Sequence, residues 1–206
     1  MTPLSSLSSD QSHLRPRLRG AVLLQLLALL PGILVSGSAA AQSVALEADA
    51  LAYPLGGYSA ALRVSHDNGV SYALGTGRYT LPAFLLKLQD SYDAAHWRAT
   101  SEAIQVLRVG YRFFGPRQDG PAADVIVLNQ LWHLEAERLD AETHFKTISV
   151  GVSGGYYFHL GSHFYLYPIA SVTFDTIYSG SASVAGHEYE VPPLGLNGSL
   201  HAGWEF

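Results

Sequence analysis

The segment 194–206, "LGLNGSLHAGWEF", alternates strictly between two kinds of side chain. One of its faces carries no polar side chain at all and consists of Leu194, Leu196, Gly198, Leu200, Ala202, Trp204 and Phe206. A period of two is the period of a β-strand, in which successive side chains point to opposite faces, and it does not fit a helix. We therefore expect a strand with one wholly apolar face.

The same alternation recurs along the chain, and turn residues separate the alternating segments. The other seven predicted strands are 44–53, 58–65, 70–77, 103–114, 124–134, 147–160 and 163–178. The segment 124–134 is almost continuously apolar, and we take Ile126, Leu128, Trp132 and Leu134 as its apolar face. Eight consecutive strands predict an all-β fold, an antiparallel up-and-down meander.

Short and long links alternate between these strands. The short ones are 66–69, 115–121 and 161–162, and the long ones are 81–101, 135–143 and 179–193. The first link, 54–57, is short where the alternation requires a long one. Within the last long link, "GHEYEV" alternates again and predicts a hairpin with "SGSAS" that extends the eighth strand.

The charges indicate which face of the meander meets lipid. Lysine occurs only at Lys87 and Lys146, whereas a soluble barrel would have many on its outer face. The polar faces instead carry isolated charges of both signs, which predict a charge network in a narrow lumen: Glu47, Asp49, Arg63, Arg108, Arg112, Asp175 and Glu205. An Arg facing mid-bilayer lipid costs about 2–4 kcal/mol, and an open sheet edge in lipid is costlier still. The chain is thus predicted to be a closed eight-stranded transmembrane β-barrel.

The pattern Leu200, Ala202, Trp204, Phe206 resembles the last strand of bacterial outer-membrane β-barrels, where it acts as a membrane-insertion signal. In strand number and length, 42–206 is similar to the small eight-stranded class that includes OmpA-type, OmpX-type and OmpW-type barrels. The resemblance implies a bacterial outer-membrane location. It also implies two partners, the barrel-insertion machinery and outer-membrane lipid with lipopolysaccharide. The long links would then face outward and the short turns the periplasm.

The segment 1–41 has the composition of a secretory signal peptide. Arg15, Arg17 and Arg19 precede the apolar run 21–35, and small residues up to Ala41 suit cleavage there. The alternative is a retained membrane anchor. Removing three Arg and one Asp from the 12 basic and 17 acidic residues leaves 9 and 16 in the segment 42–206, a balance that argues against a nucleic-acid partner. The chain has no cysteine, so disulfides and thiolate chemistry are excluded.

Candidate reactive groups are few. The link 81–101 contains Asp90, Ser91 and His96, a set reminiscent of the lipid A palmitoyltransferase barrels. His159 with Ser162 is a weaker counterpart of the His–Ser pair in lipid A deacylase barrels. The histidines form no HxH pair and no helical HxxxH pair that would converge on an ion. We expect solvated or lumenal polar groups, with no catalytic residue, cofactor or metal.

Three functions remain open on the sequence. The first is a non-enzymatic barrel with a structural, adhesive or loop-mediated binding role, whose binding surfaces would be the 81–101 loop and the 179–193 hairpin. The second is a narrow channel for small apolar solutes, as in OmpW-type barrels. The third is an enzyme that modifies lipid A acyl chains. A further hypothesis is that acidic outer links such as 135–143 hold divalent cations near lipopolysaccharide phosphates. The oligomeric state is not indicated.

Overall fold

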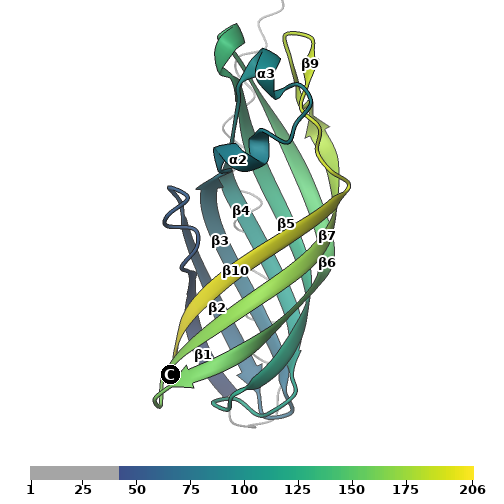
Figure 1. The fold of residues 1–206 in the computed structure, drawn as a ribbon. Coiled ribbons are helices and arrows are strands. Elements are labelled where there is room, and N and C mark those ends of the chain that lie inside the picture. The colour runs from purple at the N-terminus through teal and green to yellow at the C-terminus, as the bar shows by residue number, and fades with distance from the viewer. Residues whose placement is uncertain (1–41) are drawn as a thin grey trace, which may run out of the picture. The chain divides into compact units, whose positions relative to one another are not determined.

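The computed structural model describes residues 42–206, which form a closed antiparallel barrel of eight strands (Figure 1). The signal peptide predicted for 1–41 lies outside the described residues. The barrel strands are β1 (Gln42–Asp49), β2 (Tyr58–His66), β3 (Val70–Thr80), β4 (Trp97–Arg112), β5 (Gly120–Ala136), β6 (Ala141–Leu160), β7 (Phe164–Gly180) and β10 (Leu194–Glu205). The predicted all-β, eight-stranded meander is confirmed.

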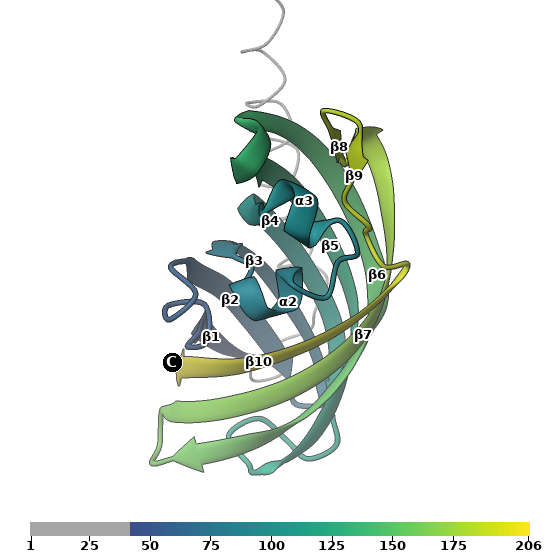
Figure 2. The same ribbon diagram turned by 45° about the horizontal axis from the view of Figure 1, so that its top comes forward.

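The barrel closes by pairing its first strand with its last (Figure 2). The registers Ala45↔Glu205 and Asp49↔His201 bound this seam. All other neighbours are consecutive in the chain, apart from the small hairpin of β8 (Ser183–Val184) and β9 (His187–Glu188), which lies between β7 and β10. No strand of the ring is therefore left without two neighbours.

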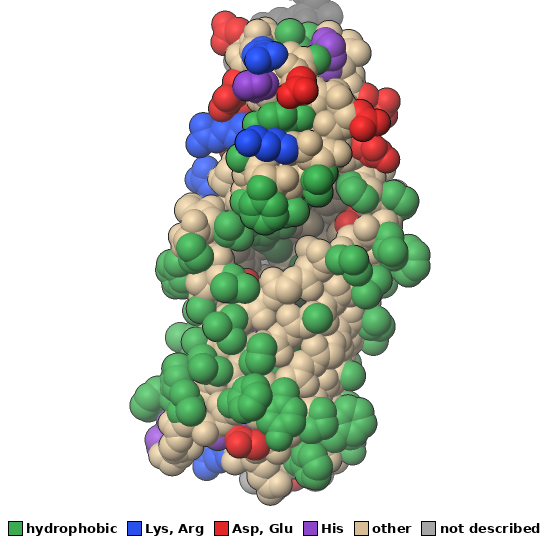
Figure 3. All heavy atoms as spheres, in the orientation of Figure 1, with side chains coloured by type: hydrophobic (Ala, Val, Ile, Leu, Met, Phe, Trp, Pro, Cys, Tyr) green, Lys and Arg blue, Asp and Glu red, His purple; other side chains and the backbone are tan. Residues whose placement is uncertain are grey.

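Side-chain burial is inverted with respect to a soluble protein. On β6, Val150 and Val152 are 48% and 59% exposed, whereas Ser149 and Ser153 are 1% and 5% exposed. On the face shown in Figure 3, hydrophobic side chains are spread over the barrel body, and charged ones gather mainly at the end that carries the long links. Apolar groups on the outside and polar groups on the inside are the arrangement that a bilayer requires of a barrel.

β5 reverses one prediction from the sequence. Ile126 and Leu134, taken there as lipid-facing together with Leu128 and Trp132, are 4% and 0% exposed and point inward with Asp124. Val125, on the opposite face, is 52% exposed. In a run that is apolar on both faces the period carries no information, and the register is decided by the partner strands.

The strands on one side of the barrel are longer than predicted. β4, β5 and β6 have 16, 17 and 20 residues, whereas a bilayer needs about 9–11. Residues 97–101, predicted as part of a loop, begin β4, and most of 135–143 is strand around a single 3₁₀ turn at Glu137–Leu139. The sheet therefore continues beyond the apolar band.

A cap with its own apolar core lies on this protruding sheet. The link between β3 and β4 folds into α2 (Ala83–Leu86) and α3 (Tyr92–Ala95), and the β8–β9 hairpin forms a separate two-stranded sheet rather than an extension of β10. The buried core consists of Leu86, Ala95, Trp97, Ala99, Leu134, Ala136, Phe145, Ala182, Val184 and Tyr189. Burial raises the pKa of the Tyr189 phenol to about 12.

No helix within residues 42–206 is long and apolar enough to span a membrane.

Candidate functional site

Six buried charged side chains meet inside the barrel, and we call them the lumen charge cluster. They are Arg63, Arg108, Arg112, Glu47, Asp124 and Glu205, and none is more than 4% exposed. They come from β1, β2, β4, β5 and β10, so the cluster joins strands from all around the ring. Three cations face three anions, and the formal charge of the cluster is zero.

Glu47 is the centre of the cluster. Its carboxylate accepts hydrogen bonds from Arg63 Nε at 2.6 Å and from Arg108 Nη2 at 2.5 Å. The Tyr165 hydroxyl donates to the same carboxylate at 2.7 Å. A buried carboxylate needs several such donors to offset the loss of water. Glu47 therefore neutralises two guanidinium groups at once.

Asp124 is the second anion of the cluster. It lies 3.3 Å from Arg63 Nη1 and accepts a hydrogen bond from the Tyr167 hydroxyl at 2.8 Å. The Arg63 guanidinium also donates to Ser71 Oγ at 2.9 Å. Arg63 thus bridges the carboxylates of Glu47 and Asp124.

Arg112 and Glu205 form the part of the cluster nearest the short turns. Arg112 Nη1 lies 3.4 Å from Glu205 Oε1, and its guanidinium carbon lies 3.9 Å from the centre of the Tyr157 ring. His159 connects the cluster to the turn surface, because its Nδ1 lies 3.1 Å from Asp119. Hydrogen bonds from His159, above all from its backbone N–H, hold the pKa of Asp119 below its usual value.

Aromatic rings fill the space between the charges. Tyr157 and Tyr167 stack with ring centres 4.0 Å apart, and Tyr165 meets Tyr157 edge-on at 5.1 Å. These three rings are at most 1% exposed. Because neither the rings nor the charges are accessible to water, side chains fill the barrel at this level.

Five of the seven charges expected from the sequence in a lumen network belong to this cluster: Glu47, Arg63, Arg108, Arg112 and Glu205. Asp49 instead lies at the end of β1, where its Oδ1 accepts hydrogen bonds from the backbone N–H groups of Leu51 and Leu200. Asp175 lies on β7 beside the cap and makes no contact with the cluster among the described residues.

Sequence reasoning missed Asp124 as a member of the cluster. By alternation it shares a face with Ile126, which the sequence analysis assigns to lipid. Its own charge was the available signal, because a carboxylate at that position could only point inward. By alternation Tyr157, Tyr165 and Tyr167 lie on the polar faces of their strands, but nothing in the sequence indicates that they stack together.

Gly203 on β10 makes room for the Tyr165 ring. A Cβ built on Gly203 would lie 2.2 Å from Tyr165 Cζ, whereas a Cβ on Gly198, on the lipid face of the same strand, would meet nothing within 4 Å. We expect Gly203→Ala to displace the ring from Glu47 and to lower the free energy of unfolding by about 1–3 kcal/mol. Urea unfolding in lipid vesicles measures this, and Gly198→Ala is the matched control. Equal stability of the two variants would contradict the close packing described.

Of the link residues singled out as reactive, Ser91 and His96 have structural partners, and Asp90 is exposed. Ser91 Oγ donates to the Glu188 carbonyl oxygen at 2.7 Å and accepts from Trp97 Nε1 at 2.9 Å. The His96 ring stacks on Tyr92 at 5.2 Å. Within residues 42–206, no hydrogen bond joins Ser91 to His96. The hydroxyl of Ser91 holds the β8–β9 hairpin to the link between β3 and β4.

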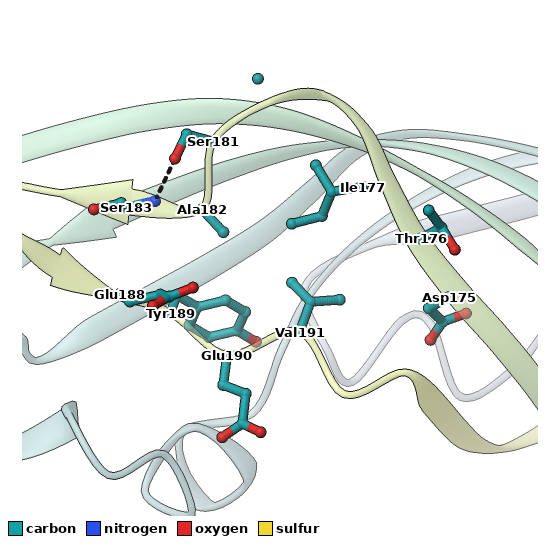
Figure 4. Close-up of a pocket in the computed structure, with 11 residues that line it drawn as sticks. Asp175, Thr176, Ile177, Ser181, Ala182, Ser183, Glu188, Tyr189, Glu190 and Val191 are labelled. Carbon is teal, nitrogen blue, oxygen red and sulfur yellow. Dashed lines mark hydrogen bonds between the residues drawn. The ribbon is translucent and has the colours of Figure 1, made fainter.

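A cavity of 470 Å³ lies between the end of β7 that leads into the last long link and the β8–β9 hairpin (Figure 4). Tyr189, Val191, Ile177 and Ala182 form its apolar side, and Asp175, Glu188 and Glu190 supply carboxylates. Hairpin and strand thus form a concave surface that is both apolar and acidic at the end with the long links.

The barrel wall has a gap beside the half of β10 that is nearer the long links. β1 pairs with β10 only up to Asp49↔His201, and from Leu194 to Ser199 the described pairing of β10 is with β7 alone. The N–H and C=O of Leu200 still reach Asp49 and Ala50. By alternation, the same groups of Leu196 and Gly198 point into the gap. A hollow is visible there between β10 and the cap (Figure 3).

The residues of the predicted insertion signal lie on the outer face at the other end of β10. Trp204 and Phe206 are 50% and 65% exposed, and the backbone N–H of Phe206 donates to the Val44 carbonyl at 2.8 Å. Leu200 and Ala202 are half-buried on the same face. These positions leave the aromatic rings accessible next to the short turns.

The sequence matches no protein family and no curated protein. Three solved structures resemble the chain: the N-terminal β-barrel domain of Pseudomonas aeruginosa OprF (TM-score 0.49, 11% identity, 80% of this chain and 96% of that one), a major outer membrane protein from Thermus thermophilus (0.46, 16%, 81% and 100%) and Neisserial surface protein A (0.43, 14%, 80% and 93%). At these values the likeness concerns the fold and carries no argument on function. On its own geometry, a closed ring with an apolar exterior and a charge-filled interior, the chain is a small membrane-spanning β-barrel of eight strands.

Proposed function

We propose that this barrel is a non-enzymatic outer-membrane protein that presents its cap as a binding surface outside the cell. The observation that carries the proposal is the docking of its two longest links onto one apolar core. Gln89 Nε2 donates to the Glu190 carbonyl at 2.9 Å, and Gln89 Oε1 accepts from the Glu190 backbone N–H at 3.0 Å. Links fixed in this way offer a shaped surface on a rigid scaffold, where recognition is usually found.

Adhesion of intact cells tests the binding role. The double variant Gln89→Ala with Ser91→Ala removes the bonds that dock the hairpin, and we expect cells that carry it to adhere to immobilised matrix glycoproteins several-fold less than cells with the wild type. The control pair Asn68→Ala with Gln118→Ala lies in the short turns and leaves adhesion unchanged. Equal adhesion of cells with and without the wild-type protein would reject the adhesive role.

The lumen charge cluster supports a barrel whose lumen is blocked to ions, because its six charged side chains are inaccessible to water. We expect the purified protein to show no ion conductance in planar lipid bilayers. A steady conductance of the wild type would contradict a filled lumen. The non-enzymatic part of the proposal has its own test, the mass spectrum of lipid A from cells with and without the protein, in which the number of acyl chains stays the same.

The gap beside β10 supports a second candidate, a narrow conduit for small apolar solutes. A solute that entered from the cap side would meet the charge cluster and leave sideways into the bilayer. Asn197 is exposed at this gap, and Asn197→Trp would narrow it. Reduced uptake of a small apolar hydrocarbon by cells carrying this variant favours the conduit, and unchanged uptake rejects it.

A further inference from the structure

Three strands bring two imidazoles and a carboxylate together on the outer surface of the protruding sheet. Glu102 of β4, His133 of β5 and His144 of β6 each offer a ligand atom, and these atoms lie within 4.8 Å of one another. The two rings stack face to face with centres 4.5 Å apart and planes 2° apart. The sequence analysis expects no converging histidines, because it considers only local HxH and helical HxxxH spacings. This pair is formed by the cross-strand register His133↔His144.

A β-bulge places the carboxylate of Glu102. The β4–β5 register passes from Ser101↔Trp132 to Ala103↔Leu131, so β4 uses two residues where β5 uses one, and Glu102 is the inserted residue. A bulge redirects a side chain, and such irregularities are over-represented beside functional sites. Glu102 Oε2 lies 3.7 Å from His144 Nε2, and Glu102 Oε1 lies 3.8 Å from His133 Nδ1.

Two more carboxylates surround the histidines. Glu142 Oε2 lies 2.9 Å from His133 Nε2, and Glu135 Oε1 lies 3.5 Å from His133 Nδ1. Among the cations on this outer face, Arg98 is 3.8 Å from Glu135, and Lys146 follows His144 by two residues. Three carboxylates against these cations leave an excess of negative charge around the two imidazoles, which favours a bound cation.

We propose that Glu102, His133 and His144 bind a divalent transition-metal ion, of which Zn²⁺ is the representative. Nitrogen and carboxylate donors suit Zn²⁺, whereas Ca²⁺ and Mg²⁺ prefer oxygen donors alone. Zn²⁺ ligands lie about 2.0–2.2 Å from the ion, so the donor atoms must approach one another slightly. The His144 side chain is 48% exposed and free to turn its ring out of the stack toward the ion. One ion would then link three strands above the bilayer.

Calorimetric titration of the full purified chain, without a polyhistidine tag, tests the site. We expect ZnCl₂ at neutral pH to bind with one ion per chain and CaCl₂ to bind at least tenfold more weakly. His144→Ala and Glu102→Gln are expected to weaken Zn²⁺ binding at least tenfold, because each removes a ligand. His187→Ala, which removes a histidine of the β8–β9 hairpin, is the matched control and keeps wild-type affinity.

A second measurement guards against variants that fail to fold. Heat-modifiable gel mobility reports the closed barrel, and Zn²⁺ is expected to raise the unfolding temperature of the wild type and of His187→Ala but not of His144→Ala. Absence of Zn²⁺ binding by the folded wild type would overturn the proposal. So would equal Zn²⁺ affinity of the folded wild type, His144→Ala and Glu102→Gln.

Discussion

Replacing Glu47 with Gln is expected to lower the free energy of unfolding by about 3–5 kcal/mol, the usual effect of removing one partner from a buried ion pair. Glu47 neutralises both Arg63 and Arg108, whose side chains are 1% and 2% exposed. Without it, two buried guanidinium groups face a neutral amide, and only Arg63 keeps a carboxylate partner, Asp124. Urea unfolding of the refolded protein in lipid vesicles, followed by tryptophan fluorescence, measures the change.

Two comparisons separate this effect from the loss of one negative charge. Glu190→Gln removes a carboxylate at the exposed cap surface and is expected to change stability by less than about 0.5 kcal/mol. Adding Arg108→Met to Glu47→Gln removes the guanidinium that Glu47→Gln leaves without a carboxylate, since Arg63 keeps Asp124 at 3.3 Å. The double variant should therefore be more stable than Glu47→Gln alone. If Glu47→Gln and Glu190→Gln were equally stable, the lumen charge cluster would not hold the strands together as described.

Val152→Arg is the second substitution with a large expected effect. Val152 is 59% exposed on β6, next to Val125 of β5 and Val172 of β7, which are also exposed. An Arg at the middle of the lipid face costs about 2–4 kcal/mol, because its charge must leave water. We expect a loss of that size in the free energy of unfolding, measured in vesicles of defined acyl-chain length.

The control for Val152→Arg is Ser162→Arg, which adds the same side chain in the turn between β6 and β7. Ser162 is exposed and outside both strands, so the charge stays in water and stability changes little. Thinner bilayers should not reduce the penalty at Val152 as strongly as at a residue close to the turn. Equal effects of the two arginines would mean that the apolar exterior does not contact lipid.

The stability of the barrel around the lumen charge cluster and the shape of the cap depend on different forces. The lumen charge cluster joins five strands by charge-assisted hydrogen bonds in a space closed to water. The cap is held by apolar burial around Trp97, Phe145 and Tyr189. Substitutions in the cap should therefore alter binding without opening the barrel. Substitutions in the lumen charge cluster should destabilise the barrel without altering the binding surface of the cap.

Much of this architecture could be predicted from alternation alone. In 147–160, Val150, Val152 and Phe158 alternate with polar or small residues, and each of them lies on the outer face. Isolated charges such as Glu47 and Arg63 could only point inward once the apolar face was assigned to lipid. Strand number, outer face and most of the lumen charges follow from this local pattern, because the pleat of one strand determines which side chains share a face.

The tertiary structure alone decided the remaining features. Beyond Asp124, whose charge indicates the inward side, both faces of β5 are apolar, so alternation does not assign them and the register with β4 and β6 does. The partners of Asp124, the docking of Gln89 on Glu190 and the meeting of His133 with His144 all join residues that are distant in sequence. The bulge at Glu102 and the gap beside β10 arise from how neighbouring strands pair. Alternation is a property of one strand, whereas contacts across strands depend on register and closure, which no single segment encodes.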